Sequence, residues 1–498
     1  MSWKSLIVVL LVLGAFTAMS GKAAAQGGPA WPQFRGPNTS GIAADGTSPP
    51  TEFAPGKRML WKAPLQAGHS SPVVWGDRIF LTSADADTKK LETLCLSAKD
   101  GSVIWRHAVT APELEYRFSV NGFASPSAVA DAERVYAYFG SYGIVALDHS
   151  GKLQWELKMP TPVAQFGTGT SPVVVDDLLV INRDEAKGGH LLALDKRTGK
   201  EVWKGMYSEQ PLLGFSKSTP VLWKDQLIVH RGSSIDSFAV KTGKRVWWVN
   251  TPTTGTSSVV FGPDAIFAST WSTYGEADQR APVPTFDALL KDNDKNTDGK
   301  LAVTELPLLM PVVKRPDVSS DIQGVEVRLN MYAGRIDSNR DGIVQPEEWS
   351  GILQWFDERG RAEHGMIAIR PTGEGDLTGQ IAWRVSTSVP EVPSPLYYEG
   401  RVYMIRNGGV ITAMDAQSGK VLYRARLGAP GPYYSSPIAA GGHLYIGSGE
   451  GVMTVWKPGD TLDVVSRNDL GEPIFATPAA VGKRLYVRTE RALYAFGE

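Results

Sequence analysis

The sequence predicts an all-β protein, an eight-bladed β-propeller of four-stranded blades that carries a small α-helical insertion. Three observations lead to this prediction: a repeat along most of the chain, two sequence marks within each repeat, and one segment, residues 272–363, that breaks the period. The repeat is about 40–50 residues long, which is typical of propellers and solenoids. A chain of 498 residues is also too long for one simple core.

The first mark is a Ser or Thr followed by Pro and then by a strand-like apolar run. The run alternates apolar positions through a strand, a polar turn and a second strand. An eighth copy, Ser257-Ser258-Val259, has lost the proline. The other copies stand at Ser71-Pro72, Ser125-Pro126, Ser171-Pro172, Thr219-Pro220, Ser394-Pro395, Ser436-Pro437 and Thr477-Pro478.

The second mark is a turn that ends in Gly and is followed four residues later by an aromatic residue. The glycine allows the backbone angles that a tight hairpin demands. The aromatic residue falls on the fourth strand, where we expect it to pack between adjacent sheets. The pairs are Gly101/Trp105, Gly151/Trp155, Gly199/Trp203, Gly243/Trp247, Gly379/Trp383 and Gly419/Tyr423.

The eighth repeat begins at Thr477 and has room for only three strands before Glu498. Residues 57–62, KRMLWK, resemble the missing fourth strand and carry Trp61. We therefore expect this N-terminal strand to close the last blade. Closure of the ring removes exposed sheet edges, which otherwise pair with other chains.

The N-terminus predicts export. Lys4 precedes an apolar stretch, residues 6–16, and Ala23-Ala24-Ala25 offers a small-residue cleavage site. The expected location is the periplasm or the extracellular space of a Gram-negative bacterium, and we expect no transmembrane span in the mature chain. The expected organisation is a signal peptide (1–25), an N-terminal extension (26–56), propeller blades (57–271), the insertion (272–363) and the remaining blades (364–498).

Composition limits the partners and the cross-links. The chain has 51 basic and 52 acidic residues and a net charge of −1, which gives no electrostatic basis for binding nucleic acid. Cys95 is the single cysteine, so no internal disulfide is expected. Its apolar surroundings favour a buried small hydrophobic residue over a nucleophile.

Two segments inside the insertion carry oxygen ligands at the spacing of an EF-hand calcium loop, Asp294–Glu305 and Asp337–Glu348. Gly299 and Gly342 stand where such a loop turns sharply. The sequence therefore predicts two Ca²⁺ sites. Their expected ligands are Asp294, Asn296, Asp298, the Lys300 carbonyl and Glu305 in the first loop, and Asp337, Asn339, Asp341, the Ile343 carbonyl and Glu348 in the second.

The surroundings of the loops favour a paired EF-hand. Leu301 and Val344 hold the apolar position through which two loops pair as short strands, and residues 284–292 and 346–356 read as flanking helices. Pro307 and Pro311 predict a short or broken helix after the first loop. A structural or docking role is expected over a sensor role, because sensors use a Met-rich groove.

A ring of residues at the mouth of the predicted axis is the candidate ligand-facing surface; an ordinary solvated rim is the alternative. The ring contains no carboxylate pair for acid–base chemistry, so no catalytic residue is predicted. Its members stand three places before the repeated proline, or before Val259: His69, Phe123, Gly169, Lys217, Thr256, Val392, Tyr434 and Phe475.

The repeat, with its Ser-Pro start and its close LLALDKRTGKEVW at residues 191–203, resembles the pyrroloquinoline-quinone-like (PQQ-like) β-propeller family. The resemblance covers residues 57–271 and 364–498. It implies one of two kinds of protein. The first is a quinoprotein dehydrogenase, which oxidises alcohols or sugars with a calcium-bound quinone. The second is a non-enzymatic scaffold, such as the propeller subunit of the outer-membrane β-barrel assembly machinery.

Within that family, we expect a calcium-binding, non-catalytic binding or assembly scaffold of the cell envelope with a protein or peptide partner. The alternative is a PQQ-dependent oxidoreductase, and a further one is an enzyme acting on a sugar or cell-wall polymer. Many quinoprotein alcohol dehydrogenases cover the quinone with a disulfide between adjacent cysteines, which a chain with Cys95 alone cannot form. This difference favours the scaffold.

Overall fold

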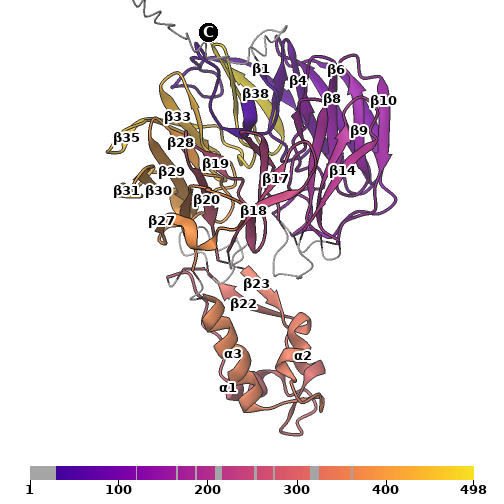
Figure 1. Ribbon diagram of the computed structural model, residues 1–498, viewed down its shortest axis with the longest axis vertical. Helices are drawn as coiled ribbons and strands as arrows, with labels where there is room; N and C mark the ends of the chain where they lie inside the picture. Colours follow the sequence, from indigo (N-terminus) through magenta and orange to yellow (C-terminus); the bar gives the residue numbers. More distant parts are fainter. Residues whose placement is uncertain are drawn as a thin grey trace, which may run out of the picture.

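A computed structural model shows eight β-sheets arranged around one axis, with a helical module standing on one face of the ring (Figure 1). The predicted eight-bladed propeller is confirmed. The signal peptide predicted at residues 1–25 lies outside the described residues. These are 30–118, 120–163, 166–185, 188–207, 216–251, 255–272, 275–276, 278–314, 325–360 and 363–498.

The first strand of each blade is short and buried near the axis, and the last is half exposed at the outer edge. Neighbouring core strands pair antiparallel. Blades 1 to 4 consist of β3 (Val73–Trp75), β4 (Arg78–Asp85), β5 (Lys90–Ser97) and β6 (Val103–Thr110); β7 (Val129–Ala130), β8 (Arg134–Phe139), β9 (Gly143–Asp148) and β10 (Leu153–Lys158); β11 (Val173–Val175), β12 (Leu178–Arg183), β13 (His190–Asp195) and β14 (Glu201–Met206); and β15 (Val221–Trp223), β16 (Gln226–His230), β17 (Ser234–Ala239) and β18 (Arg245–Asn250).

Blades 5 to 8 complete the ring. They consist of β19 (Val260–Phe261), β20 (Ile266–Thr270), β25 (Gly365–Ile369) and β27 (Ile381–Val385); β28 (Leu396–Tyr398), β29 (Arg401–Arg406), β30 (Val410–Asp415) and β31 (Val421–Arg426); β32 (Ile438–Ala440), β33 (His443–Gly447), β34 (Val452–Lys457) and β35 (Asp463–Asp469); and β36 (Ala479–Val481), β37 (Arg484–Arg488), β38 (Ala492–Phe496) and β2 (Met59–Pro64). The N-terminal strand β2 pairs antiparallel with β38, Trp61 opposite Ala495, so the predicted closure of the last blade is confirmed.

Two further strands extend the blades beyond the predicted four. β1 (Ala30–Trp31) pairs with the inner strand β3, and β26 (Gly375–Asp376) runs parallel to the outer strand β18. Short 3₁₀ turns lie at Pro37–Thr39 (η1), Val303–Glu305 (η2), Leu329–Tyr332 (η3), Thr378–Gln380 (η4) and Asn407–Gly409 (η5).

Adjacent blades are joined by a tryptophan that reaches the closing turn of the next blade. The Trp155 indole N–H donates to the Lys196 carbonyl at 3.0 Å, and a Cβ at Gly199 would lie only 2.6 Å from the indole ring. The predicted packing of aromatic residues between sheets is therefore confirmed. The same arrangement joins Trp61 to Gly101, Trp105 to Gly151, Trp203 to Gly243 and Trp383 to Gly419.

The N-terminal segment crosses the end of the axis at which the first strands finish. Pro32 accepts a hydrogen bond from the backbone of Ala130 in blade 2, and Asn38 exchanges two with Leu222 in blade 4. Gly41 accepts one from Ala439 in blade 7. Because these blades lie far apart around the ring, the segment closes this end of the central channel.

The insertion leaves the ring between β20 and β25 and has its own hydrophobic core. Its elements are α1 (Phe286–Asn293), β21 (Leu301–Ala302), β22 (Leu309–Val313), β23 (Val325–Arg328), α2 (Ala333–Ile336), β24 (Ile343–Val344) and α3 (Pro346–Gly360). The two predicted flanking helices are α1 and α3. As the prolines predicted, the helix at the end of the first loop is reduced to the 3₁₀ turn η2, which forms the last three residues of the loop before the chain enters β22.

Candidate functional site

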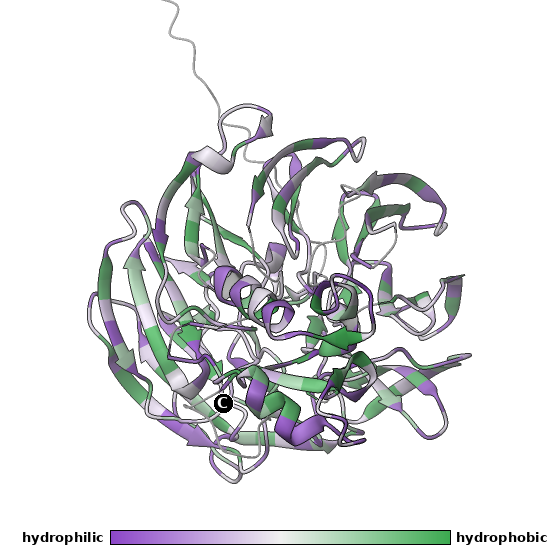
Figure 2. Cartoon of the chain, turned by 90° about the horizontal axis from the view of Figure 1, so that it is seen from below, coloured by the Kyte–Doolittle hydropathy of each residue, from purple (hydrophilic) through white to green (hydrophobic). Residues whose placement is uncertain are grey.

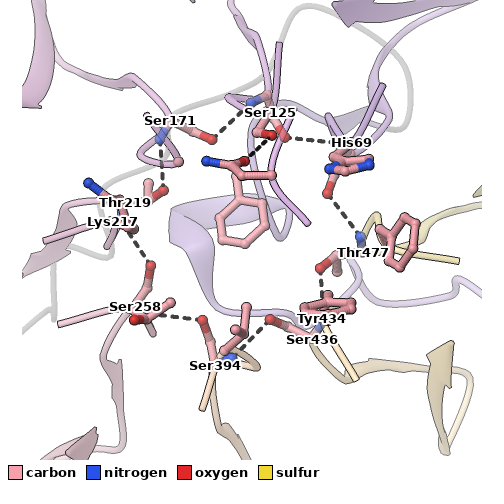
Figure 3. A pocket seen from close by; sticks show the side chains of 18 of the residues that line it. His69, Ser125, Ser171, Lys217, Thr219, Ser258, Ser394, Tyr434, Ser436 and Thr477 are labelled. Carbon is pink, nitrogen blue, oxygen red and sulfur yellow. Dashed lines mark hydrogen bonds between the residues drawn. The ribbon is translucent and has the colours of Figure 1, made fainter. Parts of the chain in front are cut away.

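A closed circle of hydrogen bonds joins the eight blades around the axis. The residue two places before the first strand of each blade is Ser or Thr, and its side-chain oxygen accepts the backbone N–H of its counterpart in the preceding blade (Figure 3). The distances lie between 2.8 and 3.0 Å. The circle runs through Ser71, Ser127, Ser171, Thr219, Ser258, Ser394, Ser436 and Thr477 and returns to Ser71.

These hydroxyl groups line a pocket of about 220 Å³ on the axis. Seven of the eight rim residues put forward from the sequence also line it, namely His69, Gly169, Lys217, Thr256, Val392, Tyr434 and Phe475. Phe34 from the N-terminal segment contributes to the wall as well. The N-terminal segment closes one end of the channel. The pocket therefore opens at the other end, on the face of the ring that this segment leaves uncovered.

Phe123 is the rim residue that the structure places outside the pocket wall, under the guanidinium of Arg117 at 4.6 Å from the ring centroid. In blade 2 the hydrogen-bonded circle passes through Ser127, two residues after the Ser-Pro step used to set the register. The equivalent rim position is therefore Ser125, which does line the pocket. The doubled serine in Ser125-Pro126-Ser127 concealed this shift.

Aromatic side chains form much of the wall. His69, Phe475 and Tyr434 come from three successive blades and pack edge to face, with ring centroids 4.9 and 5.2 Å apart. Across the pocket Phe118 and Phe166 meet at 5.9 Å. Asn121 fixes their two loops together, because its side-chain amide donates to the Phe166 carbonyl at 2.8 Å. The pocket thus has a largely apolar wall above a circle of hydroxyl groups.

The charged groups of the wall are few. Burial lowers the pKa of the Lys217 ammonium to about 8, although the carboxylates of Asp184 and Glu115 oppose this shift. Burial, with the positive charges of Arg488 and Arg117, lowers the pKa of His69 to about 4. His69 is therefore neutral at pH 7, and Lys217 remains mostly protonated.

The inserted module stands over the face on which the pocket opens. Figure 2, seen from below, shows its helices in front of the middle of the ring. Trp271 belongs both to the pocket wall and to the module core. Arg328 of the module donates to the Tyr116 hydroxyl at 3.0 Å, and Glu276 accepts from Arg406 at 3.2 Å. The module is therefore anchored to two different sides of the ring.

The two candidate calcium loops have the same internal hydrogen bonds. In the first, Asp294 accepts the backbone N–H groups of Asp298 and Gly299 at 3.2 and 2.9 Å. In the second, Asp337 accepts those of Asp341 and Gly342, both at 3.1 Å. Each terminal glutamate, Glu305 or Glu348, likewise accepts from loop positions 2 and 9.

The loops are joined through their short strands. β21 and β24 pair antiparallel with Leu301 opposite Val344, as expected for paired loops. Side-chain oxygens of Asn296 and Asn339 accept from Asp298 and Asp341 at 2.9 and 2.8 Å, which fixes the third position of each loop.

The donor set of each loop is all oxygen, which fits a hard cation such as Ca²⁺. Gly299 and Gly342 take positive φ angles of 75° and 82°, as the sharp turn of such a loop requires. Among the described residues, no three His, Cys, Asp or Glu side chains come together as a metal centre. In both loops the carboxylates are instead held by N–H groups of the loop itself.

The fold has clear structural relatives. A europium-containing methanol dehydrogenase covers 94% of this chain and 98% of its own, with a TM-score of 0.56 and 12% identity. A quinohemoprotein alcohol dehydrogenase from Comamonas testosteroni covers 94% and 80%, with a TM-score of 0.53 and 12% identity. At such identity the likeness concerns the fold alone.

Within the described residues, no helix combines the length and the apolar character that crossing a membrane requires. A curated relative, outer membrane protein assembly factor BamB of Alkalilimnicola ehrlichii, is 28% identical over 164 residues. This match spans 32% of the chain and 38% of the relative. A family model described as outer membrane protein assembly factor BamB matches residues 51–279 and 372–437, more than half of the sequence. The chain therefore belongs to this family of PQQ-like β-propellers.

Proposed function

We propose that this chain is a non-catalytic, calcium-binding scaffold of the cell envelope that binds a protein partner on the face carrying the axial pocket. The observation that carries the proposal is the pocket itself, an apolar cavity with hydrogen-bond donors at the point where all eight blades converge. Apolar pockets with a few fixed polar groups are typical binding sites. The family and its relative named as an outer membrane assembly factor support an envelope role.

The surface around the mouth supports a macromolecular partner. The loops that bring Phe118 and Phe166 to the pocket also carry Tyr116 and Val163, whose side chains are 54% and 71% exposed. Large apolar side chains clustered beside a cavity are typical of protein-binding surfaces. The predicted signal peptide is consistent with a periplasmic partner.

The two loops of the module would each hold one Ca²⁺ through the oxygens of Asp294, Asn296, Asp298, Lys300 and Glu305, and of Asp337, Asn339, Asp341, Ile343 and Glu348. The ion supplies positive charge that holds these oxygens together. If calcium is about 1 mM and each site binds at about 10 µM, each site adds roughly 2.7 kcal/mol to the stability of the folded module. Since Trp271 joins the module core to the pocket wall, a stable module also fixes that wall.

Cross-linking from single cysteines tests the binding face. Cys95 is buried, so a cysteine introduced at Val163 beside the pocket carries the photoreactive label selectively. The matched control is Lys224→Cys, which lies in the exposed turn after β15 and therefore on the opposite face of the ring. In an envelope extract, we expect a discrete cross-linked partner from Val163→Cys and none from Lys224→Cys. Equal cross-linking from both faces would contradict the proposal.

A second measurement separates the scaffold from the oxidoreductase. Purified protein is mixed with PQQ and Ca²⁺ and assayed for quinone absorbance and for dye-linked oxidation of alcohols and sugars. The scaffold predicts neither signal, and turnover would overturn the non-catalytic assignment. Titration of Ca²⁺ into chelator-stripped protein should release heat corresponding to two sites, and a flat calorimetric trace would overturn the calcium assignment.

A further inference from the structure

The inserted module is attached to the ring at a single blade. The chain leaves blade 5 after Thr270 and returns at Gly365, and these two residues pair with each other between β20 and β25. The Thr270 hydroxyl also donates to the Gly365 carbonyl at 2.8 Å and accepts the Gly365 N–H at 2.9 Å. We call this paired exit of the two chain segments the stalk. Both covalent connections of the module therefore lie at one place on the ring.

The far end of the module contacts the opposite side of the ring. Arg328 on β23 donates to the Tyr116 hydroxyl at 3.0 Å, and its guanidinium lies 4.9 Å from the centre of the tyrosine ring. Tyr116 belongs to the connection between β6 and β7, which joins blade 1 to blade 2. Blade 5 stands opposite blade 1 in a ring of eight. The module therefore crosses the axis, and Figure 2 shows its helices in front of the middle of the ring.

The contacts beside the stalk are buried. Glu276 is 8% exposed, and its carboxylate accepts the backbone N–H groups of Ser388 and Val389 at 3.0 and 2.6 Å. It also accepts from the guanidinium of Arg406 in blade 6 at 3.2 Å. Val389 and Trp271 pack in the hydrophobic core of the module. Because a buried carboxylate is costly to separate from its partners, this side of the module stays fixed to the ring.

The contact at the far end is exposed. Tyr116 is 54% exposed, and Arg328 is exposed as well. A hydrogen bond and a cation–π contact between exposed side chains add little net stability, because water competes for the same groups. This contact can therefore break while the buried contacts beside the stalk persist. An element held firmly at one end and weakly at the other moves as a hinged unit.

The weak contact lies beside the mouth of the axial pocket. Tyr116 stands two residues before Phe118, which lines the pocket and packs against Phe166 with ring centroids 5.9 Å apart. At the stalk, Trp271 directly follows Thr270 and lines the pocket too. The module thus spans the mouth from one wall of the pocket to the other. Its position determines how much of the mouth a large ligand can reach.

We propose that the inserted module is a hinged lid on the axial pocket, with its hinge at the stalk on blade 5 and a latch formed by Arg328 and Tyr116. The latch holds the lid across the mouth. Its release exposes the pocket, and the apolar side chain of Val163 beside it, to a partner. The inference rests on the proposed scaffold function and names how access to the binding face is controlled.

Distances between spin labels test the movement of the lid. The mature protein carries labels on cysteines introduced at Val163 beside the mouth and at Lys291, an exposed residue of α1, while the buried Cys95 stays unlabelled. Double electron–electron resonance compares this labelled protein with its Arg328→Ala variant and with the control Arg340→Ala, an exposed arginine of the second candidate calcium loop. We expect a longer distance component in Arg328→Ala alone, because only this variant lacks the latch.

Labelling of a cysteine inside the pocket tests access. Val392→Cys places a thiol on the pocket wall, and its reaction with a bulky maleimide reagent is followed over time. We expect Arg328→Ala to raise the labelling rate about three- to fivefold, as loss of an exposed cation–π contact implies. Arg340→Ala should leave the rate unchanged. The effects of Arg328→Ala and Tyr116→Ala should not add, because each variant breaks the same contact.

The lid would be overturned by an unchanged distance distribution in Arg328→Ala, or by equal labelling of Val392→Cys with and without the latch. Additive effects of Arg328→Ala and Tyr116→Ala would overturn the latch. An unchanged melting temperature of each variant excludes partial unfolding as the cause of faster labelling. Cross-linking from Val163→Cys reports on the partner in the intact protein, so a rigid module with a successful cross-link refutes the lid and leaves the scaffold intact. A moving module without any cross-link refutes the scaffold and supports the lid.

Discussion

Ser394 illustrates how one side-chain oxygen holds two blades together. Its hydroxyl accepts the Ser258 N–H at 3.0 Å, and both residues are buried. In Ser394→Ala the Ser258 N–H loses its acceptor at a site with little access to water. A buried donor left unpaired costs about 1–3 kcal/mol. We expect the free energy of unfolding, measured by urea denaturation, to fall by that amount.

Threonine occupies the equivalent place in blades 4 and 8, as Thr219 and Thr477, so Ser394→Thr is the matched control. It keeps the acceptor oxygen and should stay within about 0.5 kcal/mol of the wild type. An equal loss in both variants would show that volume, and not the hydrogen bond, matters at this position.

Glu348 is the ligand residue on which the second calcium loop depends most, because a glutamate at this position supplies two oxygens. Glu348→Gln removes a negative charge and one strong oxygen ligand. We expect the affinity of that loop for Ca²⁺ to fall about tenfold or more, with the first loop retained. Calorimetric titration of chelator-stripped protein measures both sites.

Glu347 provides the control for this change, since it neighbours Glu348 and is exposed outside the ligand positions of the loop. Glu347→Gln should leave both sites close to their wild-type affinities. If Glu347→Gln weakened Ca²⁺ binding as much as Glu348→Gln, the ion would be attracted by the negative charge of the region and not by the ligand geometry of the loop.

The glycine at the end of each closing turn determines how closely two blades approach. Gly199 has a φ of +72°, and an added Cβ would lie 2.6 Å from the Trp155 ring. Gly199→Ala therefore combines backbone strain with a steric clash against the indole, and we expect a loss of about 2–4 kcal/mol in thermal or chemical denaturation. Trp155 fluorescence should change with it.

Gly442 separates the two causes. Its φ is +71°, and nothing lies within 4 Å of an added Cβ. Gly442→Ala should therefore show the backbone cost alone, about 1–2 kcal/mol. Similar losses at Gly199 and Gly442 would argue against a packing role for the glycine–tryptophan contact.

The periodic elements of the fold could be predicted from sequence, because strand alternation and hairpin glycines are local properties. The register of blade 2 could not be fixed in this way. Ser125 and Ser127 both satisfy the pattern, and only the hydrogen bond from Ser71 to Ser127 distinguishes them. The rim residue was placed three positions before the repeated proline. Counting two positions back from the Ser or Thr of the hydrogen-bonded circle, which is Ser127 in blade 2, gives Ser125.

Other features depend on contacts between distant segments and had no local signal. β26 joins the outer strand of blade 4 although it belongs to the connection within blade 5. The N-terminal segment closes the channel through backbone hydrogen bonds with Ala130 and Ala439, which any sequence could make.

The ring as a whole depends on the strand that brings its two ends together. β2 supplies the outer strand of blade 8, and Trp61 buries its ring against blade 1 with its N–H donating to Ala98 at 3.2 Å. Without residues 26–64, β38 would become an open edge and the interface between blades 8 and 1 would lose its tryptophan. We expect the melting temperature to fall by about 5 °C or more.

A shorter truncation distinguishes closure of the ring from closure of the channel. Removal of residues 26–56 deletes the segment that crosses the channel and keeps β2. If pairing with β38 is the larger contribution, this variant should melt above the variant lacking residues 26–64, and a synthetic peptide of residues 57–66 should restore part of the lost stability of the longer truncation. Equal melting temperatures for the two truncations, with no effect of the peptide, would assign the stabilisation to the channel-crossing segment.

An edge strand left open also invites intermolecular pairing. Sedimentation of the longer truncation should therefore show association that the same peptide suppresses, because the peptide occupies the edge of β38.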